Sequence, residues 1–180
     1  MKFECLCGNI IVDQTDYLPY KGYLISDQDL FDLMDSVDHA IEKSGPTSLD
    51  KEQAIMDIRN LETQLMKIVY QCTQCKRLYI NDNHNKLNEF IPIRANNERS
   101  ILASALGDKW KRPLIGDWND SRSGELKGYI WCQDYKDRSD YSNFEDLERE
   151  YYKQLAFLTE NNILRTAMLR YNDQIIHSWE

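Results

Sequence analysis

Two close pairs of cysteines, Cys5-x-Cys7 and Cys72-x-x-Cys75, constrain this chain more than any other feature of its sequence. They account for four of the five cysteines. Structural Zn²⁺ takes four thiolate or imidazole ligands in a tetrahedron, and a close pair of cysteines supplies two of them at once. We therefore expect Cys5, Cys7, Cys72 and Cys75 to hold one zinc ion. Because all four ligands would come from the protein, the ion would stabilise the fold and leave no position open for a substrate.

Two other interpretations of the cysteines stay open. Reduced, buried thiols can pack as small hydrophobic side chains without any metal. Alternatively, the Cys72/Cys75 pair could serve a thiol-dependent enzyme, although no βαβ pattern surrounds it. The fifth cysteine, Cys132, has no partner in the sequence pattern and receives no role.

The segments Cys5-Leu6-Cys7-Gly8 and Cys72-Thr73-Gln74-Cys75 resemble the zinc-ribbon class of proteins. The resemblance covers these two segments and implies a fold element in which two knuckles on β-hairpins hold one metal ion. Sixty-four residues, 8–71, separate the two pairs, more than a minimal ribbon needs. We expect a helical insertion to fill this interval.

The interval carries two helical patterns. Ser26 caps a run in which Leu30, Met34, Val37 and Ile41 recur at helical spacing, and Gly45-Pro46 ends it. A second helix follows, capped by Thr47 or Ser48, with an apolar stripe made by Ala54, Ile58, Leu61, Leu65 and Ile68. The short connection predicts an antiparallel helical hairpin.

Shorter elements flank this hairpin. We expect one short strand within residues 3–12, a loop over 13–22, and a β-hairpin that carries the Cys72/Cys75 knuckle at its base and turns at residues 81–85. Further on we expect a short helix over 100–106, a loop through Pro113 and Trp118, and a strand over 126–132.

The C-terminal part ends with a helix and a hairpin. Ser142-Asn143-Phe144-Glu145 forms a capping-box pattern, and Asn161-Asn162 ends the helix that follows it. Asn172-Asp173 lies between two β-prone runs and predicts a final hairpin. The fold class is therefore α+β: a zinc-ribbon-like element with an inserted helical hairpin over residues 1–94, and a C-terminal α+β lobe over residues 95–180. The polar stretch 95–99 marks the boundary.

Charge is concentrated on the first predicted helix. Asp32, Asp35, Asp38 and Glu42 follow one another at steps of three and four residues, which places them along one side as an acidic ridge. The ridge is either an ordinary solvated face or a docking surface for a basic protein. The formal net charge of −8 disfavours nucleic acid as a partner.

Catalytic patterns are sparse. His39, His84 and His177 lie in unrelated segments, and the sequence has no serine-hydrolase, metalloprotease or phosphate-loop motif. No apolar run approaches the roughly 20 residues of a membrane span, and the N-terminus lacks the apolar stretch of a secretory signal. We expect a cytoplasmic protein without a membrane segment.

These observations together predict a non-enzymatic, zinc-stabilised protein that binds a basic protein through its acidic surface. One specific form is a bacterial immunity protein that neutralises a toxin, since such a protein needs a compact acidic surface and no active site. The alternatives are a thiol-dependent enzyme that uses Cys72 and Cys75, and a zinc-ribbon protein that binds nucleic acid.

Overall fold

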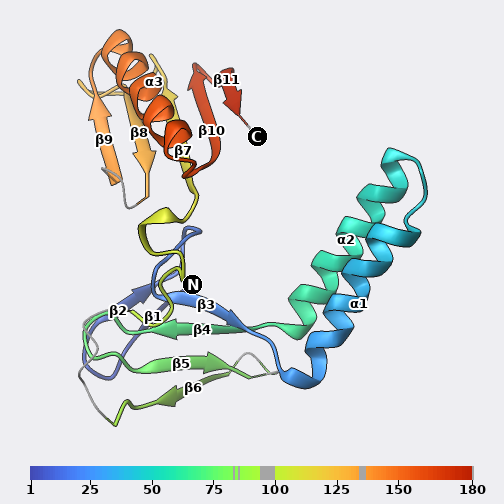
Figure 1. The fold of residues 1–180 in the computed structure, drawn as a ribbon. Coiled ribbons are helices and arrows are strands. Elements are labelled where there is room, and N and C mark those ends of the chain that lie inside the picture. The colour runs from blue at the N-terminus through green and yellow to red at the C-terminus, as the bar shows by residue number, and fades with distance from the viewer. Residues whose placement is uncertain (83, 85, 94–99, 134–136, 180) are drawn as a thin grey trace. The chain divides into compact units, whose positions relative to one another are not determined.

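The computed structural model describes residues 1–82, 84, 86–93, 100–133 and 137–179. It divides into two compact units, Met1–Ala103 and Ser104–Glu180, and both contain helices and strands (Figure 1). The predicted α+β class is confirmed. The sequence boundary at residue 95 lies outside the described residues and stays a prediction.

The first unit begins with a β-hairpin that the sequence did not predict. We expected one strand within residues 3–12, but β1 (Lys2–Glu4) and β2 (Ile10–Val12) pair antiparallel. Residues 5–9, which include the first cysteine pair, form the turn between them. The single-strand prediction was wrong because the turn that interrupts the β-prone run consists mostly of residues without a strong turn preference.

A four-stranded antiparallel sheet forms the body of the first unit. Its strands follow the order β3-β4-β5-β6, and their bounds are β3 (Lys21–Leu24), β4 (Lys67–Gln71), β5 (Leu78–Asn81) and β6 (Leu87–Phe90). The predicted hairpin, which turns at residues 81–85 and has the second cysteine pair at its base, corresponds to β5 and β6. The first two residues of β3, Lys21 and Gly22, were expected to end a loop. Residues 83 and 85 of the predicted turn lie outside the described residues.

The predicted helical hairpin is confirmed. Helix α1 (Asp27–Lys43) begins after Ser26, and α2 (Ser48–Leu65) begins after Thr47, whose side chain and backbone form a capping box with Asp50. The two helices lie side by side and extend from one end of the four-stranded sheet (Figure 1). No residue of either helix is buried.

The apolar stripe predicted on α1 is only partly covered. Val37 is half-buried, whereas Met34 and Ile41 keep 51% and 76% of their surface exposed. The side of α1 that faces inward instead includes Leu33 and Ala40, which are half-buried. A helix in a two-helix hairpin has one neighbour, so the rest of its apolar surface stays in contact with solvent.

Residues 100–106, predicted as a helix, form turns, and the short 3₁₀ helix η1 (Gly107–Lys109) follows them. The first turn is tied to the first unit by its own polar groups. The side-chain oxygen of Gln71 accepts hydrogen bonds from the Ser100 hydroxyl (2.7 Å) and the Ile101 backbone N–H (2.9 Å). These bonds hold the turn against the end of β4, and the prediction of a helix here was wrong.

The second unit is a five-stranded mixed sheet with one helix. The strand order is β11-β10-β7-β8-β9, and the elements are β7 (Arg112–Trp118), β8 (Gly128–Cys132), β9 (Asp137–Tyr141), α3 (Phe144–Glu160), β10 (Leu164–Tyr171) and β11 (Gln174–Trp179). β10 is parallel to β7, and the other pairs are antiparallel. Helix α3 makes the crossover between β9 and β10.

The core of the second unit lies between α3 and one face of this sheet. Its fully buried members include Leu114, Ile130, Leu147, Tyr151 and Leu169. The helix approaches β7 closely because Gly116 has no side chain: a Cβ there would lie 2.5 Å from Leu169 and 3.1 Å from Tyr151. This core holds the second unit together through apolar burial.

The loop expected through Pro113 and Trp118 is the central strand β7, so that prediction was wrong. The loop was predicted partly because of Pro113, but this proline lies near the start of the strand, before the pairing with β8 begins at Ile115. The strand β9 has the sequence Asp-Arg-Ser-Asp-Tyr. It was not predicted because such a polar, charged composition is typical of a loop. The predicted strand at β8, the helix α3 and the final hairpin are confirmed, and Asn172 and Asp173 have the positive φ values of a tight hairpin turn.

Candidate metal centre

The first cysteine pair sits in the tight turn between β1 and β2. The Cys5 N–H donates to the Asn9 carbonyl, and the Gly8 N–H donates to the Cys5 carbonyl, both at 2.8 Å. Gly8 has φ +86°, a left-handed conformation that glycine adopts without strain. The turn therefore folds back sharply directly after Cys7.

The second cysteine pair lies in the turn between β4 and β5 and has a similar local design. The Cys72 N–H donates to the Arg77 carbonyl (2.8 Å), and the Lys76 N–H donates to the Cys72 carbonyl (3.0 Å). Lys76, directly after Cys75, has φ +65°. In both turns the residue that follows the second cysteine is left-handed, so the chain reverses direction directly after each pair.

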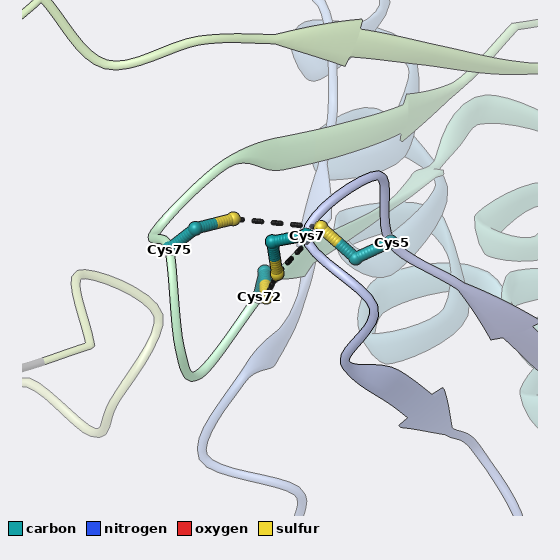
Figure 2. A group of neighbouring side chains, drawn as sticks. All are labelled: Cys5, Cys7, Cys72 and Cys75. Atoms are coloured by element: carbon teal, nitrogen blue, oxygen red, sulfur yellow. Dashed lines mark hydrogen bonds between the residues drawn. The ribbon is translucent and has the colours of Figure 1, made fainter.

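The two turns bring the four cysteines together, as Figure 2 shows. The Sγ atom of Cys5 lies 3.4 Å from that of Cys75 and 3.4 Å from that of Cys7. The Cys7 sulfur lies 3.7 Å from the Cys72 sulfur, and all four ligand atoms lie within 4.8 Å of one another. We call this group the sulfur cluster.

The spacing of the sulfur cluster fits a tetrahedral metal ion. With Zn–S bonds of about 2.3 Å, the edge of the sulfur tetrahedron would measure about 3.8 Å. The sulfur–sulfur separations of 3.4–3.7 Å given above are close to that edge. They are far longer than a disulfide bond of about 2.05 Å, and all five cysteines are free. The donor set of four thiols suits Zn²⁺ or iron and excludes Mg²⁺ and Ca²⁺, which prefer oxygen.

Three polar side chains around the cluster donate hydrogen bonds to sulfur. The Tyr79 hydroxyl lies 3.1 Å from the Cys5 sulfur, the Asn9 amide 3.5 Å from that of Cys72, and the Arg77 guanidinium 3.7 Å from that of Cys75. Donors in this position stabilise thiolates and fix the orientation of metal ligands. None of the three was predicted from the sequence. The predicted strand after Cys75 could have identified Arg77 and Tyr79, because residues two apart share one face of a strand.

The thiols of the cluster differ in how readily they ionise. Burial opposes ionisation of Cys5, but hydrogen bonds from the Cys7 backbone N–H and the Tyr79 hydroxyl outweigh it and lower its pKa to about 6. At Cys7 a backbone hydrogen bond from Asn9 favours the thiolate, yet burial and the neighbouring sulfurs dominate and raise the pKa to about 12. Four sulfurs this close cannot all be negative unless a cation lies between them.

A small aromatic core lies next to the sulfur cluster. The Phe3 ring stands edge-on to the rings of Tyr70 (5.4 Å) and Tyr79 (5.2 Å). The Tyr70 hydroxyl donates to Asp13 at 2.6 Å, and Asp13 pairs with Lys21 at 2.8 Å. These contacts fasten the β1–β2 hairpin to the four-stranded sheet, and so fix one cysteine pair relative to the other.

The other candidate residues lie elsewhere. The acidic ridge, made by Asp32, Asp35, Asp38 and Glu42, is exposed along α1, as is His39. His84 is exposed after β5, and His177 accepts or donates a hydrogen bond at 2.9 Å with the Tyr151 hydroxyl in the second unit. Cys132 is buried in β8 and is not part of the sulfur cluster. None of the helices in the described part of the chain is long and apolar enough to cross a membrane.

The fold and the site define a two-unit α+β protein with a four-cysteine centre in its first unit. The model of the family described as "Domain of unknown function (DUF8617)" matches residues 1–99. This match spans more than half of the chain, so the chain belongs to that family. No curated protein and no solved structure matches it. The matched region contains all four clustered cysteines and the helical hairpin.

Proposed function

We propose that this chain is a non-enzymatic binding protein in which one zinc ion, held by Cys5, Cys7, Cys72 and Cys75, stabilises a base from which the helical hairpin engages a basic protein partner. The observation that carries the proposal is the hairpin itself. It has no buried residue and combines exposed apolar side chains with a strong negative charge. Under this proposal the zinc-ribbon-like part is the base that holds the zinc ion, and the helical hairpin binds the partner.

The charge of the hairpin supports a basic partner. Residues 27–65 contain ten acidic and three basic residues, a net charge of −7, whereas the whole chain has a net charge of −8. Almost the entire net negative charge of the protein therefore belongs to α1, α2 and their connection, since acidic and basic residues nearly balance in the rest of the chain. A local concentration of this kind accelerates encounter with a cationic surface and rejects anionic ones, including nucleic acid.

The apolar residues of α1 lie next to its acidic ridge. Phe31 is 67% exposed and is in line with Asp35, Asp38 and Glu42, at steps of four, three and four residues. Met34 and Ile41 follow the adjacent line and are also exposed. An apolar centre with a charged border is the usual composition of a protein interface. It supports a protein partner over a small cation.

The sulfur cluster supports a structural role for the metal. Cys5 and Cys72 are 1% and 0% exposed, so a substrate in solution does not reach their sulfurs. A nucleophilic or redox cysteine needs exposure, which Cys5 and Cys72 lack, whereas Cys7 and Cys75 are half-buried. The burial of Cys72 disfavours an enzyme that uses the Cys72/Cys75 pair. In its specific form, the proposal is that the chain is a toxin-neutralising immunity protein. Its partner is then a basic toxic enzyme, and it acts in the cytoplasm.

The test uses the full metal-loaded chain as bait, followed by identification of the captured protein and kinetic measurement with that purified protein. Neutralising the ridge with Asp32→Asn, Asp35→Asn and Asp38→Asn should slow association at least tenfold and reduce its salt dependence. Stability should change little, because these carboxylates are exposed.

A matched control neutralises three exposed acidic residues of the second unit, with Asp108→Asn, Glu125→Gln and Glu160→Gln. This control should associate as the unmodified protein does. An acidic partner, or equal on-rates for the ridge variant, the control and the unmodified protein, would refute the proposal.

A further inference from the structure

Strand β11 is an open edge of the five-stranded sheet. It pairs with β10 on one side, and among the described residues of the second unit no strand lies on its other side. An edge strand keeps a row of backbone N–H and C=O groups that can pair with another strand. The opposite edge of the same sheet is β9, which provides an internal comparison.

The two edges carry different side chains. Strand β11 reads Gln-Ile-Ile-His-Ser-Trp and contains no lysine, arginine, acidic residue or proline. Its apolar residues Ile175, Ile176 and Trp179 are 60%, 45% and 47% exposed. Strand β9 carries Arg138 and Asp140, which form an ion pair of 2.8 Å. Charged side chains on an edge oppose pairing with a further strand, so β9 is protected in a way that β11 is not.

One protective feature remains on β11. The register shifts between Leu169, which faces His177, and Arg170, which faces Ile175, so Ile176 is an extra residue in a β-bulge. A bulge increases the local twist of an edge strand. It adds no charge, and the exposed apolar residues stand on both sides of it.

We propose that a second copy of this chain adds its own β11, antiparallel, to the open edge of β11, so that the two five-stranded sheets become continuous. A two-fold arrangement of this kind lets each copy use the same surface. The strand has no formal charge, so pairing with its own copy brings no like charges together, and its isoleucines supply an apolar partner for the isoleucines of the other copy. The helical hairpin, in contrast, has a net charge of −7 and would repel its own copy.

Aromatic side chains extend the apolar surface beside the strand. The Tyr152 ring of α3 is 41% exposed, and its centre lies 5.5 Å from that of His177. With Trp179 at the end of β11, the strand is flanked by the residue types that homodimer interfaces favour. This inference does not depend on the function proposed above, because it concerns the other unit of the molecule.

The test is sedimentation of the full metal-loaded chain over a wide concentration range. The unmodified protein should pass from monomer to dimer as the concentration rises. The double substitution Ile175→Lys and Ile176→Lys should lower the association constant at least tenfold, since it places two charges on each meeting strand. The matched control, Ile91→Lys and Ile93→Lys, changes two exposed isoleucines of the first unit and should associate as the unmodified protein does.

Hydrogen exchange of the unmodified protein gives a second readout if the lysine variant fails to fold. The β11 amides that are not bonded to β10 should become more protected as concentration rises, whereas amides of β9 should not change. A protein that stays monomeric throughout, equal association of the lysine variant, or protection that appears only when a different protein binds β11 would overturn the proposal.

Discussion

The two units of this protein stay folded by different means. Buried apolar side chains in the first unit form a small group, and two of its five members, Cys5 and Cys72, belong to the sulfur cluster. The second unit packs a helix on a sheet through leucine, isoleucine and aromatic side chains. We therefore expect the first unit to depend on the sulfur cluster that joins two of its turns, and the second unit on ordinary apolar burial. The comparison teaches that a metal ion held by the sulfur cluster would be a local requirement of the first unit.

The largest expected effect comes from Cys72→Ser. Losing one ligand should release the metal and unfold the first unit, because structural zinc contributes about 10–16 kcal/mol in small modules, more than most domains have in reserve. Hydrogen exchange should show loss of protection in β4 and β5 and retention in β7 and β10. The control, Cys132→Ser, changes the buried cysteine of the second unit and should keep the metal. A Cys72→Ser protein with unchanged metal content and melting temperature would break the comparison.

The next effect concerns the core of the second unit. Leu169→Ala removes a fully buried side chain and should lower the free energy of unfolding of that unit by about 2–5 kcal/mol. Metal content and protection of the first unit should not change, and Leu126→Ala, at an exposed position, should cost less than about 0.5 kcal/mol. Denaturant titration with segment-resolved hydrogen exchange measures both. Release of metal by Leu169→Ala would show that the two units are not independent.

A smaller effect should follow from Tyr79→Phe, which removes the hydroxyl that donates to the Cys5 sulfur at 3.1 Å. Loss of a partner that orients a metal ligand lowers metal affinity by about tenfold or more. Competition with a chromophoric chelator measures this change. Tyr23→Phe, at an exposed tyrosine of β3 in the same sheet, is the control and should bind metal normally. Equal affinities for the two variants would remove Tyr79 from the site.

The smallest expected effect concerns the pH dependence of the stability of the second unit. Hydrogen bonds from Asn172, Trp118 and Tyr171 hold the pKa of Asp120 below its ordinary value of 3.8. Because the folded-state pKa is lowered, Asp120 stabilises the second unit above the unfolded pKa, and this contribution is lost as pH falls through the folded one. Asp120→Asn should reduce the melting temperature of the second unit at neutral pH and make it less sensitive to acid. Glu125→Gln, on the same connection, should do neither.

The sequence predicted the helices better than the strands, for physical reasons that particular residues illustrate. Thr47 with Asp50 and Asn143 with Glu145 mark helix starts by local hydrogen bonds, and local signals are readable along the chain. Strand β7 is buried on both faces and has a proline as its second residue, and β9 is a charged edge. Their identity comes from neighbours distant in sequence, which no local pattern records.

The candidate site was predictable to a similar extent. The cysteine spacing was sufficient to predict that four thiols would gather, because chelating pairs are a local feature. It did not identify Tyr79, Asn9 or Arg77, whose bonds to sulfur exist only once the two turns meet. The open edge at β11 could not be predicted from the sequence either, since an edge is a property of the assembled sheet.

Native mass spectrometry of the purified chain at neutral pH tests the central claim most directly. The account predicts one zinc ion per chain, and complete protection of the four clustered thiols from alkylation until a chelator removes the ion, while Cys132 stays unmodified as long as the second unit is folded. A chain that is folded, carries no bound metal and leaves its clustered thiols open to alkylation would contradict it.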